Sequence, residues 1–310
     1  MTGTTLTALK AAQLGLMLKP LDAAVFVAPW LTAPPTAFTS SSSLLQPLPA
    51  GYVSVGTIDK KSGITFARAI TDAPIESYGY LQPTRDDITT DITTIEFEPQ
   101  QTNALTLSLT TSAAIGSITA NASSGEVFFA QPLDEEITYY SMIVIGKDGN
   151  NATPTYIFKV MPKVAITKLG GEQWTPTTVK SQKLTATAFP DSTVGYAVAH
   201  GFGGTGWTAQ LANTGITYTV ATLTVSPSSI NVVHTAGAQA PLVVMDQFGG
   251  IVATNSNGTL SFTSGTTATA TVNSSTGVIT PVAAGTTVIT ATWTPTSGSP
   301  VTGTCNVTCT

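Results

Sequence analysis

The stretch Thr267-Ala-Thr-Ala-Thr-Val-Asn-Ser-Ser-Thr-Gly-Val-Ile-Thr-Pro-Val-Ala-Ala-Gly-Thr-Thr-Val-Ile-Thr-Ala-Thr-Trp293 decides the fold of the last third of the chain. Threonine alternates with small apolar residues over Thr267–Val272, which is the period of a half-buried strand. Asn273–Gly277 then predicts a turn, and Val278–Val282 predicts a second strand. A third strand follows, in which alternate residues form one apolar face: Thr287, Ile289, Ala291 and Trp293.

The residues before this stretch have the same character. Leu242–Asp246 predicts a strand, and Gln247–Gly250 predicts a turn. Short strands at even spacing, with turns between them, predict an immunoglobulin-like β-sandwich of about 90 residues. The many threonines suit its outer faces, because they are β-branched and form hydrogen bonds with water without carrying charge.

Charge and composition change along the 310-residue chain. All twelve Lys and Arg residues lie at or before Lys183, and Asp246 is the only charged side chain after Asp191. Residues 221–310 contain 22 Thr and 10 Ser. We therefore predict two domains, 1–220 and 221–310, joined by a linker at Tyr218–Leu223.

The first domain is also expected to be rich in strands. Tyr139–Ile145 and Thr155–Val160 are apolar segments on either side of Lys147–Asn151, which is a strong hairpin signal. Val179–Phe189 predicts a further strand. The fold class predicted for the whole chain is all-β. A Pro- and Ser-rich segment at residues 33–50 predicts a loop or an arm.

One segment of the first domain is ambiguous between strand and helix. Leu105, Leu107 and Leu109 have the spacing of one face of a strand. Thr111–Ile118 predicts a short helix directly after it.

Sites for catalysis, metals and cofactors are not predicted, and we do not expect an enzyme. The two histidines, His200 and His234, lie in different predicted domains, and no serine lies in a nucleophile motif. Cys305 and Cys309 would lie on one face of a strand about 13 Å apart, too far for a disulfide. We expect two small buried side chains there.

Partners that need a basic face or a membrane segment are also disfavoured. The net charge is −5, whereas a protein that binds nucleic acid tightly needs clustered positive charge. No apolar run approaches the roughly 20 residues of a membrane helix. Met1–Lys19 is a poor secretory signal, because Lys10 and Lys19 interrupt its apolar stretch. We expect synthesis in a cytoplasm.

The acidic stretch Arg85–Glu98 is the best candidate for a functional face. Its carboxylates could line an interior wall or pair across subunit contacts with basic side chains. The alternative is a solvated strand edge, where charge discourages wrong pairing. The candidate acids are Asp86, Asp87, Asp91, Glu96 and Glu98, and the candidate bases are Lys60, Lys61 and Arg68.

The opening stretch also resembles a known family. Thr269–Ala291, together with the upstream Asp246-Gln-Phe-Gly249 turn, is similar to the signature of group 2 bacterial immunoglobulin-like domains. The resemblance covers about the last ninety residues. It implies a fold and only loosely a role, since such domains occur in intimin-type adhesins, surface enzymes and phage virion proteins.

A second resemblance covers most of residues 20–200. Four segments, in this order, resemble the major tail (tube) proteins of long-tailed phages that infect actinobacteria. Phe189-Pro-Asp-Ser-Thr-Val-Gly-Tyr-Ala-Val198 is the most specific of them. The other three are Asp22–Pro29, Leu48–Ile58 and Arg85–Ile88.

The second resemblance implies a structural virion protein. Such subunits form hexameric rings that stack into a hollow tube, to which each contributes strands of a central barrel. A long loop and an N-terminal arm bind the neighbouring ring, and residues 33–50 and 1–20 are the candidates for these, with ordinary surface loop as the alternative. The implied partners are other copies, a tape measure protein, and tail tip and terminator proteins. Genomic DNA would pass through without specific binding, because an acidic wall repels phosphate.

The C-terminal domain would then face outward and bind host-surface glycans weakly, with avidity from many copies. Three other functions fit parts of the sequence. A capsid decoration or baseplate protein differs only in its assembly state. A bacterial surface adhesin is disfavoured by the absence of tandem copies. A carbohydrate-active enzyme is disfavoured because aromatic residues make up only 7% of the chain.

Overall fold

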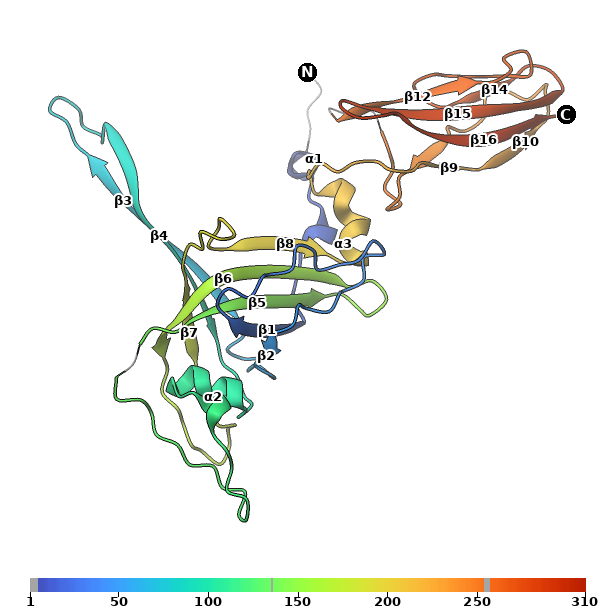
Figure 1. Cartoon of the computed structure of the whole chain (residues 1–310). Coiled ribbons are helices and arrows are strands. Elements are labelled where there is room, and N and C mark those ends of the chain that lie inside the picture. The colour runs from blue at the N-terminus through green and yellow to red at the C-terminus, as the bar shows by residue number, and fades with distance from the viewer. Residues whose placement is uncertain (1–4, 135, 254–256) are drawn as a thin grey trace. The chain divides into compact units, whose positions relative to one another are not determined.

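The computed structural model describes residues 5–134, 136–253 and 257–310. They form two compact units (Figure 1). The first is Lys19–Thr205, and the second combines the residues up to Leu18 with Gly206–Thr310. Both are built mainly from strands with a few short helices, so the predicted all-β class is confirmed. The boundary predicted near residue 220 stays a prediction.

The first unit contains one large antiparallel sheet. Its strands follow the order β2-β1-β5-β6-β7-β4-β3, and β8 also pairs with β6. The predicted hairpin is confirmed as β5 and β6, whose turn is formed around Gly149 with φ +79°. The strands are β1 (Asp22–Pro29), β2 (Val53–Ser54), β3 (Thr65–Ile75), β4 (Arg85–Phe97), β5 (Tyr139–Asp148), β6 (Thr155–Leu169), β7 (Leu184–Ala188) and β8 (Ala199–Gly203).

One face of this sheet carries the larger core. Val27 and Met142 lie opposite each other on β1 and β5, and Met142 lies opposite Met161 on β6. All three side chains are buried, together with Ile95 and Phe97 from the end of β4. Because β4 reaches this core only at its last residues, the rest of that strand lies beyond the packed part of the sheet.

Helix α2 (Ala104–Thr111) packs on the same face. The prediction of a strand at Leu105, Leu107 and Leu109 is therefore wrong. Asn103 caps the helix by accepting a hydrogen bond from the Thr106 backbone N–H, and the Thr106 hydroxyl accepts one from the Asn103 N–H. These reciprocal bonds give hydrogen-bond partners to two backbone N–H groups that would otherwise be unpaired at the start of the helix.

The boundaries of two other predicted elements also differ. The helix predicted at Thr111–Ile118 is wrong, since α2 ends at Thr111 and only the 3-10 turn η2 (Ile115–Ser117) follows. The strand predicted at Val179–Phe189 is shorter, because β7 covers only Leu184–Ala188.

The opposite face of the sheet is covered partly by the Pro- and Ser-rich segment, residues 33–50. The Phe38 ring stacks on Phe158 of β6 with centroids 4.3 Å apart. Leu48 packs against the same cluster, and the Tyr52 hydroxyl lies 2.7 Å from the hydroxyl of buried Ser141. These contacts hold part of the segment on its own subunit. Its role as a loop that binds a neighbouring ring stays a prediction.

The second unit contains a β-sandwich. A four-stranded sheet, β10-β16-β15-β12, shares one core with the strand pairs β11–β9 and β13–β14. Phe262, Ile279, Ile289 and Trp293 are buried in that core. Its strands are β9 (Thr224–Ser226), β10 (Ser229–Val232), β11 (Val243–Met245), β12 (Gly258–Ser264), β13 (Ala270–Val272), β14 (Ile279–Pro281), β15 (Gly285–Pro295) and β16 (Val301–Cys309).

Cys305 and Cys309 both lie on β16 and are buried, with free thiols. Short helices complete the second unit before the sandwich. These are α1 (Leu6–Lys10), η1 (Leu14–Leu16), α3 (Thr205–Gln210), whose first residue belongs to the first unit, and η3 (Leu211–Asn213).

The predicted linker is held on the sandwich by Asp246, the single acidic residue of the sandwich. The carboxylate of buried Asp246 accepts hydrogen bonds from the Tyr218 hydroxyl and from the Phe248 and Gly250 backbone N–H groups. The neighbouring Gln247 side chain accepts from the Ala221 N–H at 2.9 Å. The chain entering the sandwich is therefore fixed by side-chain contacts with the turn at residues 246–250.

We expect the second unit to lose stability between about pH 10 and 12. Burial, and then the hydrogen bond to Asp246, raise the pKa of Tyr218 from 10.0 to about 12. The neutral phenol therefore stabilises the fold fully below pH 10, and this contribution disappears as the pH rises through the folded-state pKa. No Lys, Arg or other Tyr occurs after Tyr218. Thermal unfolding of wild type and Tyr218→Phe should show the smaller alkaline loss in the variant. An equal loss in both would contradict the assignment.

Candidate assembly surfaces

The strands β3 and β4 continue beyond the sheet as a two-stranded arm (Figure 1). β7 pairs with β4 only over Thr93–Phe97, so the part of β4 from Arg85 to Ile92 has β3 as its single neighbour among the described residues. Residues 67–92 are exposed on both faces. Isolated two-stranded hairpins are marginally stable in water, and free strand edges invite pairing. The arm therefore has the properties of an element completed by another chain.

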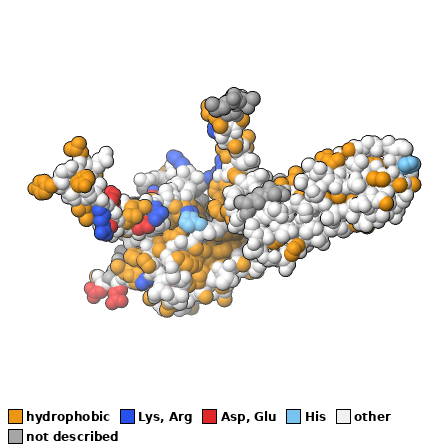
Figure 2. All heavy atoms as spheres, turned by 90° about the horizontal axis from the view of Figure 1, so that it is seen from above, with side chains coloured by type: hydrophobic (Ala, Val, Ile, Leu, Met, Phe, Trp, Pro, Cys, Tyr) orange, Lys and Arg blue, Asp and Glu red, His pale blue; other side chains and the backbone are white. Residues whose placement is uncertain are grey.

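The tip of the arm, which we define as Ile75–Thr84, is both ordered and apolar. The Thr84 N–H donates to the Ile75 carbonyl oxygen at 2.9 Å, and the Ser77 and Thr84 hydroxyls lie 2.8 Å apart. Tyr78 and Leu81 are fully exposed, at 107% and 106%. Figure 2 shows apolar side chains gathered at the end of the arm. An exposed apolar group held in a defined turn is typical of a contact surface.

Two of the predicted acids pair with bases on the arm itself. Asp91 receives two hydrogen bonds from the Arg68 guanidinium, at 2.8 and 2.6 Å, and these lower its pKa. Asp87 forms an ion pair with Arg85 at 2.8 Å. Of the predicted pairings, only Arg68–Asp91 is formed in the described residues, and it is formed within one chain.

A third predicted acid, Asp86, lies beside a second carboxyl group. Asp86 lies diagonally across the arm from Asp72, since the register pairs Asp86 with Pro74 and Asp72 with Ile88, next to a register shift between Thr71 and Asp72. Partial loss of solvent raises the pKa of Asp86, and the charge of Asp72 raises it further. This end of the arm therefore carries local negative charge near the apolar tip.

Glu96 and Glu98 lie at the root of the arm. Glu96 forms an ion pair with Lys183 on the segment leading into β7, and that contact lowers its pKa. Glu98 accepts a hydrogen bond from the Ser62 hydroxyl at 2.6 Å and another from Ser181. Both carboxylates thus join neighbouring segments of their own subunit.

Lys60 and Lys61 lie in the turn before β3 and do not pair with the predicted acids in the described part of the chain. A backbone hydrogen bond from Ser62 lowers the pKa of Asp59, and the charge of Lys61 contributes to that lowering. Whether any of these charges faces a lumen or another subunit stays a prediction.

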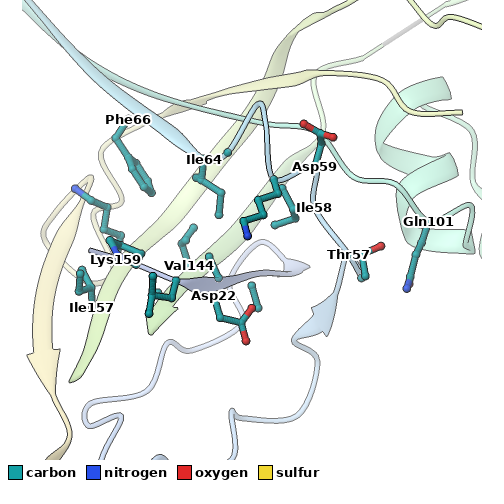
Figure 3. A pocket seen from close by; sticks show the side chains of 18 residues that line it. Asp22, Thr57, Ile58, Asp59, Ile64, Phe66, Gln101, Val144, Ile157 and Lys159 are labelled. Carbon is teal, nitrogen blue, oxygen red and sulfur yellow. The ribbon is translucent and has the colours of Figure 1, made fainter. Parts of the chain in front are cut away.

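A groove lies at the root of the arm on the face that carries the larger core (Figure 3). Its volume is ≈ 870 Å³. Ala23, Gly146 and Ile157 lie opposite one another on β1, β5 and β6 and form part of its floor. Ile64 and Phe66, where β3 begins, line one side. No motif in the sequence marks this groove, because its residues come from separate strands and turns.

The groove contains a lysine that has no carboxylate partner in the described part of the chain. The Lys159 ammonium group lies 4.4 Å from the centre of the Phe66 ring and 3.1 Å from Nδ1 of His200. Burial lowers the pKa of Lys159. Loss of solvent, followed by the Lys159 charge, lowers the pKa of His200. An anionic group entering the groove would gain an ion pair there.

A second cluster missed from the sequence anchors the segment that carries the most specific tail-tube resemblance. The Trp30 indole N–H donates to the carboxylate of Asp191 at 2.8 Å, and the Thr193 backbone N–H donates to the same carboxylate at 2.7 Å. The Lys163 ammonium group lies 4.4 Å from the Trp30 ring centre and 4.3 Å from that of Tyr139. These contacts fix residues 189–196 on the sheet.

We expect Asp191→Asn to destabilise the first unit more at pH 7 than below pH 3.8. The hydrogen bond from Trp30, followed by that from Thr193, lowers the pKa of Asp191 below its ordinary 3.8. A lowered pKa means that the ionised carboxylate stabilises the fold above the ordinary value, and that this contribution disappears as the pH falls through the folded-state value. Thermal midpoints of both proteins across this range test the prediction. A constant difference between them would contradict it.

The outer face of the four-stranded sheet in the sandwich consists mainly of threonines. Thr263, Thr290 and Thr304 lie side by side on β12, β15 and β16. The next row is formed by Ser261, Thr292 and Thr302. Asp246 is the only charged side chain in this part of the sequence and is buried. The face therefore offers rows of hydroxyl groups without charge.

Metal and membrane sites find no support in the described residues. No group of three or more His, Cys, Asp or Glu side chains within residues 5–134, 136–253 and 257–310 could hold a metal ion. Within the same ranges, no helix has the length and apolar character needed to span a membrane.

Comparison with known proteins gives one family. A family model described as phage tail tube protein matches residues 11–197. The match covers more than half of the chain, including every strand of the first unit up to β7, the arm and the Trp30–Asp191 cluster. No curated protein matches the chain.

Proposed function

Since the chain belongs to the phage tail tube proteins, we propose that it assembles into hexameric rings that stack to form the DNA conduit of a long-tailed phage. As a member of this family it is a structural subunit of the tail tube, and its place is the virion. The finer assignment to a phage of actinobacteria rests on the resemblance at Phe189–Val198.

The arm is the observation that carries the proposal of self-assembly. It exposes both strand edges, both faces and an apolar tip, although it belongs to the matched family region. In a ring or a stack, strands of neighbouring copies would cover these surfaces. Residues 1–20 and 33–50 are proposed as additional contacts between rings. The exposed Leu6 and Leu9 of α1 support this role for the N-terminal segment.

The proposed conduit carries negative charge. The chain has a net charge of −5, and Asp86, Asp87, Asp91, Glu96 and Glu98 follow one another along β4 and its end. Carboxylates near the lumen would repel DNA phosphates and so permit passage without binding. Tape measure, tail tip and terminator proteins are the proposed additional partners.

The C-terminal sandwich is proposed to be a group 2 immunoglobulin-like domain that faces outward and binds neutral host-surface glycans. Its uncharged threonine rows support a neutral, hydroxyl-bearing partner. Each contact would be weak, and the many copies along a tube would supply avidity. Multimerised residues 221–310 should be retained on host cells, and Thr290→Glu with Thr304→Glu should reduce retention. Failure of the multimerised domain to bind cells would count against glycan binding.

Negative-stain electron microscopy of the purified protein at rising concentration tests the tube itself. Hollow rings or tubes with external knobs are the expected result. A protein that remains monomeric even when tail-initiation partners are added would overturn the proposal and favour a decoration, baseplate or adhesin function.

A further inference from the structure

We propose that the groove at the root of the arm receives the arm tip of a second copy of the same chain. This inference rests on the proposed self-assembly and identifies the two surfaces that would meet. It joins the fully exposed Tyr78 and Leu81 of one subunit to the open apolar floor formed by Ala23, Gly146 and Ile157 of the next.

The groove is open because α2 and the segments beside it cover only part of this face, and strands β1 and β6 continue past them. Within the same face, Val27, Met142 and Met161 are buried beneath α2 and neighbouring segments, whereas Ala23 and Ile157 lie farther along β1 and β6 and remain accessible. The small side chain of Ala23 leaves room above β1, while Pro20 packs over Gly146, where a Cβ would lie 3.4 Å from the Pro20 Cβ. A volume of ≈ 870 Å³ can hold several such side chains.

One charged side chain of the groove, Lys159, favours an occupant that brings a carboxylate with it. Lys159 lies in the groove against Phe66 without a carboxylate partner among the described residues, and Lys60 also lines the groove. Asp22 and Asp59 line it as well, so the groove carries charges of both signs. The tip carries Glu76, and Asp72 and Asp86 follow it along the arm. Tip and groove therefore match in polarity, and an incoming Glu76 would give Lys159 the carboxylate partner that it lacks among the described residues of its own subunit.

The tip already has an ordered conformation in the unbound subunit. Hydrogen bonds between Ile75, Ser77 and Thr84 close the turn, and Gly79 takes φ +87° to permit it. A turn that is already ordered loses little conformational entropy when it docks, so more of the contact free energy appears as affinity.

The tip cannot fill the groove of its own subunit. Phe66 lies at the start of β3, and the strand extends for 11 residues toward the tip. Phe66 and Ile75, the first residue of the tip, are nine residues apart, which at about 3.3 Å per residue separates them by about 30 Å along the hairpin. The contact must therefore join different subunits through two different surfaces. Such a head-to-tail contact propagates into rings or open filaments, whereas a symmetric contact would stop at a dimer.

Disulfide trapping tests this contact in the full chain. Lys60→Cys and Leu81→Cys place one thiol at the groove rim and one at the tip, both at exposed positions. The native Cys305 and Cys309 are buried and should not interfere. Mild oxidation of the assembled double variant should give a ladder of covalent oligomers on a non-reducing gel. The matched control combines Leu81→Cys with Ser123→Cys, an exposed position outside the groove, and should give no ladder.

The outcomes separate this contact from the proposed function. Tubes that form without a ladder, or with an equal ladder in the control, would overturn the groove contact and leave the tube function standing. Absence of both tubes and cross-links at every concentration would count against both. As a second readout, assembly should protect Lys159 from an amine-acylating reagent at least tenfold more than Lys180, an exposed lysine outside the groove and outside the proposed contacts, measured by peptide mass spectrometry. Unprotected Lys159 in tubes would also overturn the contact.

Discussion

Leu81→Asp at the arm tip is expected to abolish tube formation while the monomer remains folded. Leu81 is 106% exposed and contributes no packing to its own subunit, so the substitution should leave the thermal midpoint unchanged. In an assembly, the substitution would remove the apolar contact of Leu81 and would take a carboxylate out of water at a mainly apolar surface, at a cost of about 2–5 kcal/mol. Each 1.4 kcal/mol is about a factor of ten in affinity, so the concentration needed for assembly should rise about 30-fold or more.

The control for this variant is Ile251→Asp. Ile251 is also an exposed apolar residue, at 69%, but it belongs to the C-terminal sandwich, which the proposed function places outside the tube contacts. Sedimentation velocity and electron microscopy should show tubes for wild type and Ile251→Asp and only monomers for Leu81→Asp. Normal tubes from Leu81→Asp would remove the arm tip from the assembly interface.

A chain that ends at Val220 is expected to form tubes of reduced outer diameter. Every strand of the large sheet, the arm and the groove lies within Lys19–Thr205, so the truncation removes none of them. The core of the sandwich is formed by residues after that point, with Val220 at its margin, and it would leave as a unit. The truncation must be made genetically, because no Lys or Arg after Lys183 offers trypsin a cleavage site.

The comparison needs full-length and truncated proteins at equal concentration. Images of both should show the same inner channel, with the external knobs present only in the full-length protein. Separately added residues 221–310 should not restore the knobs, because the proposed function gives this domain no contact with the tube other than the chain that joins them. A truncated protein that stays folded but monomeric would instead assign the sandwich a role in assembly.

Local sequence patterns were reliable where the partner strand lies nearby. The hairpin of β5 and β6 was predicted because two apolar runs flank the Lys147–Asn151 turn, and its pairing needs only a few residues of separation. The leucines at residues 105–109 were misassigned, since a short apolar run has no unambiguous period and the capping bonds of Asn103 and Thr106 selected the helix.

The acidic stretch shows where such patterns stop being informative. Alternation along β4 predicts a strand and gives the order of its charges, and the strand is present. It does not predict that β7 ends after covering five residues, which leaves Ile88 and Ile92 exposed on the arm. Nor does it predict that Asp91 pairs with Arg68 of the same hairpin.

The all-β class, the sandwich at the C-terminal end and the resemblance to tail tube proteins could all be derived from residue order, because periodicity and turn chemistry are local properties. The open arm, the groove and the Trp30–Asp191 contact could be found only in the folded chain. Trp30 and Asp191 are 161 residues apart, and the groove combines residues from β1, β5, β6 and the turn before β3. Periodicity tells which face of a strand is apolar, but the length and register of distant neighbouring strands decide whether that face is covered.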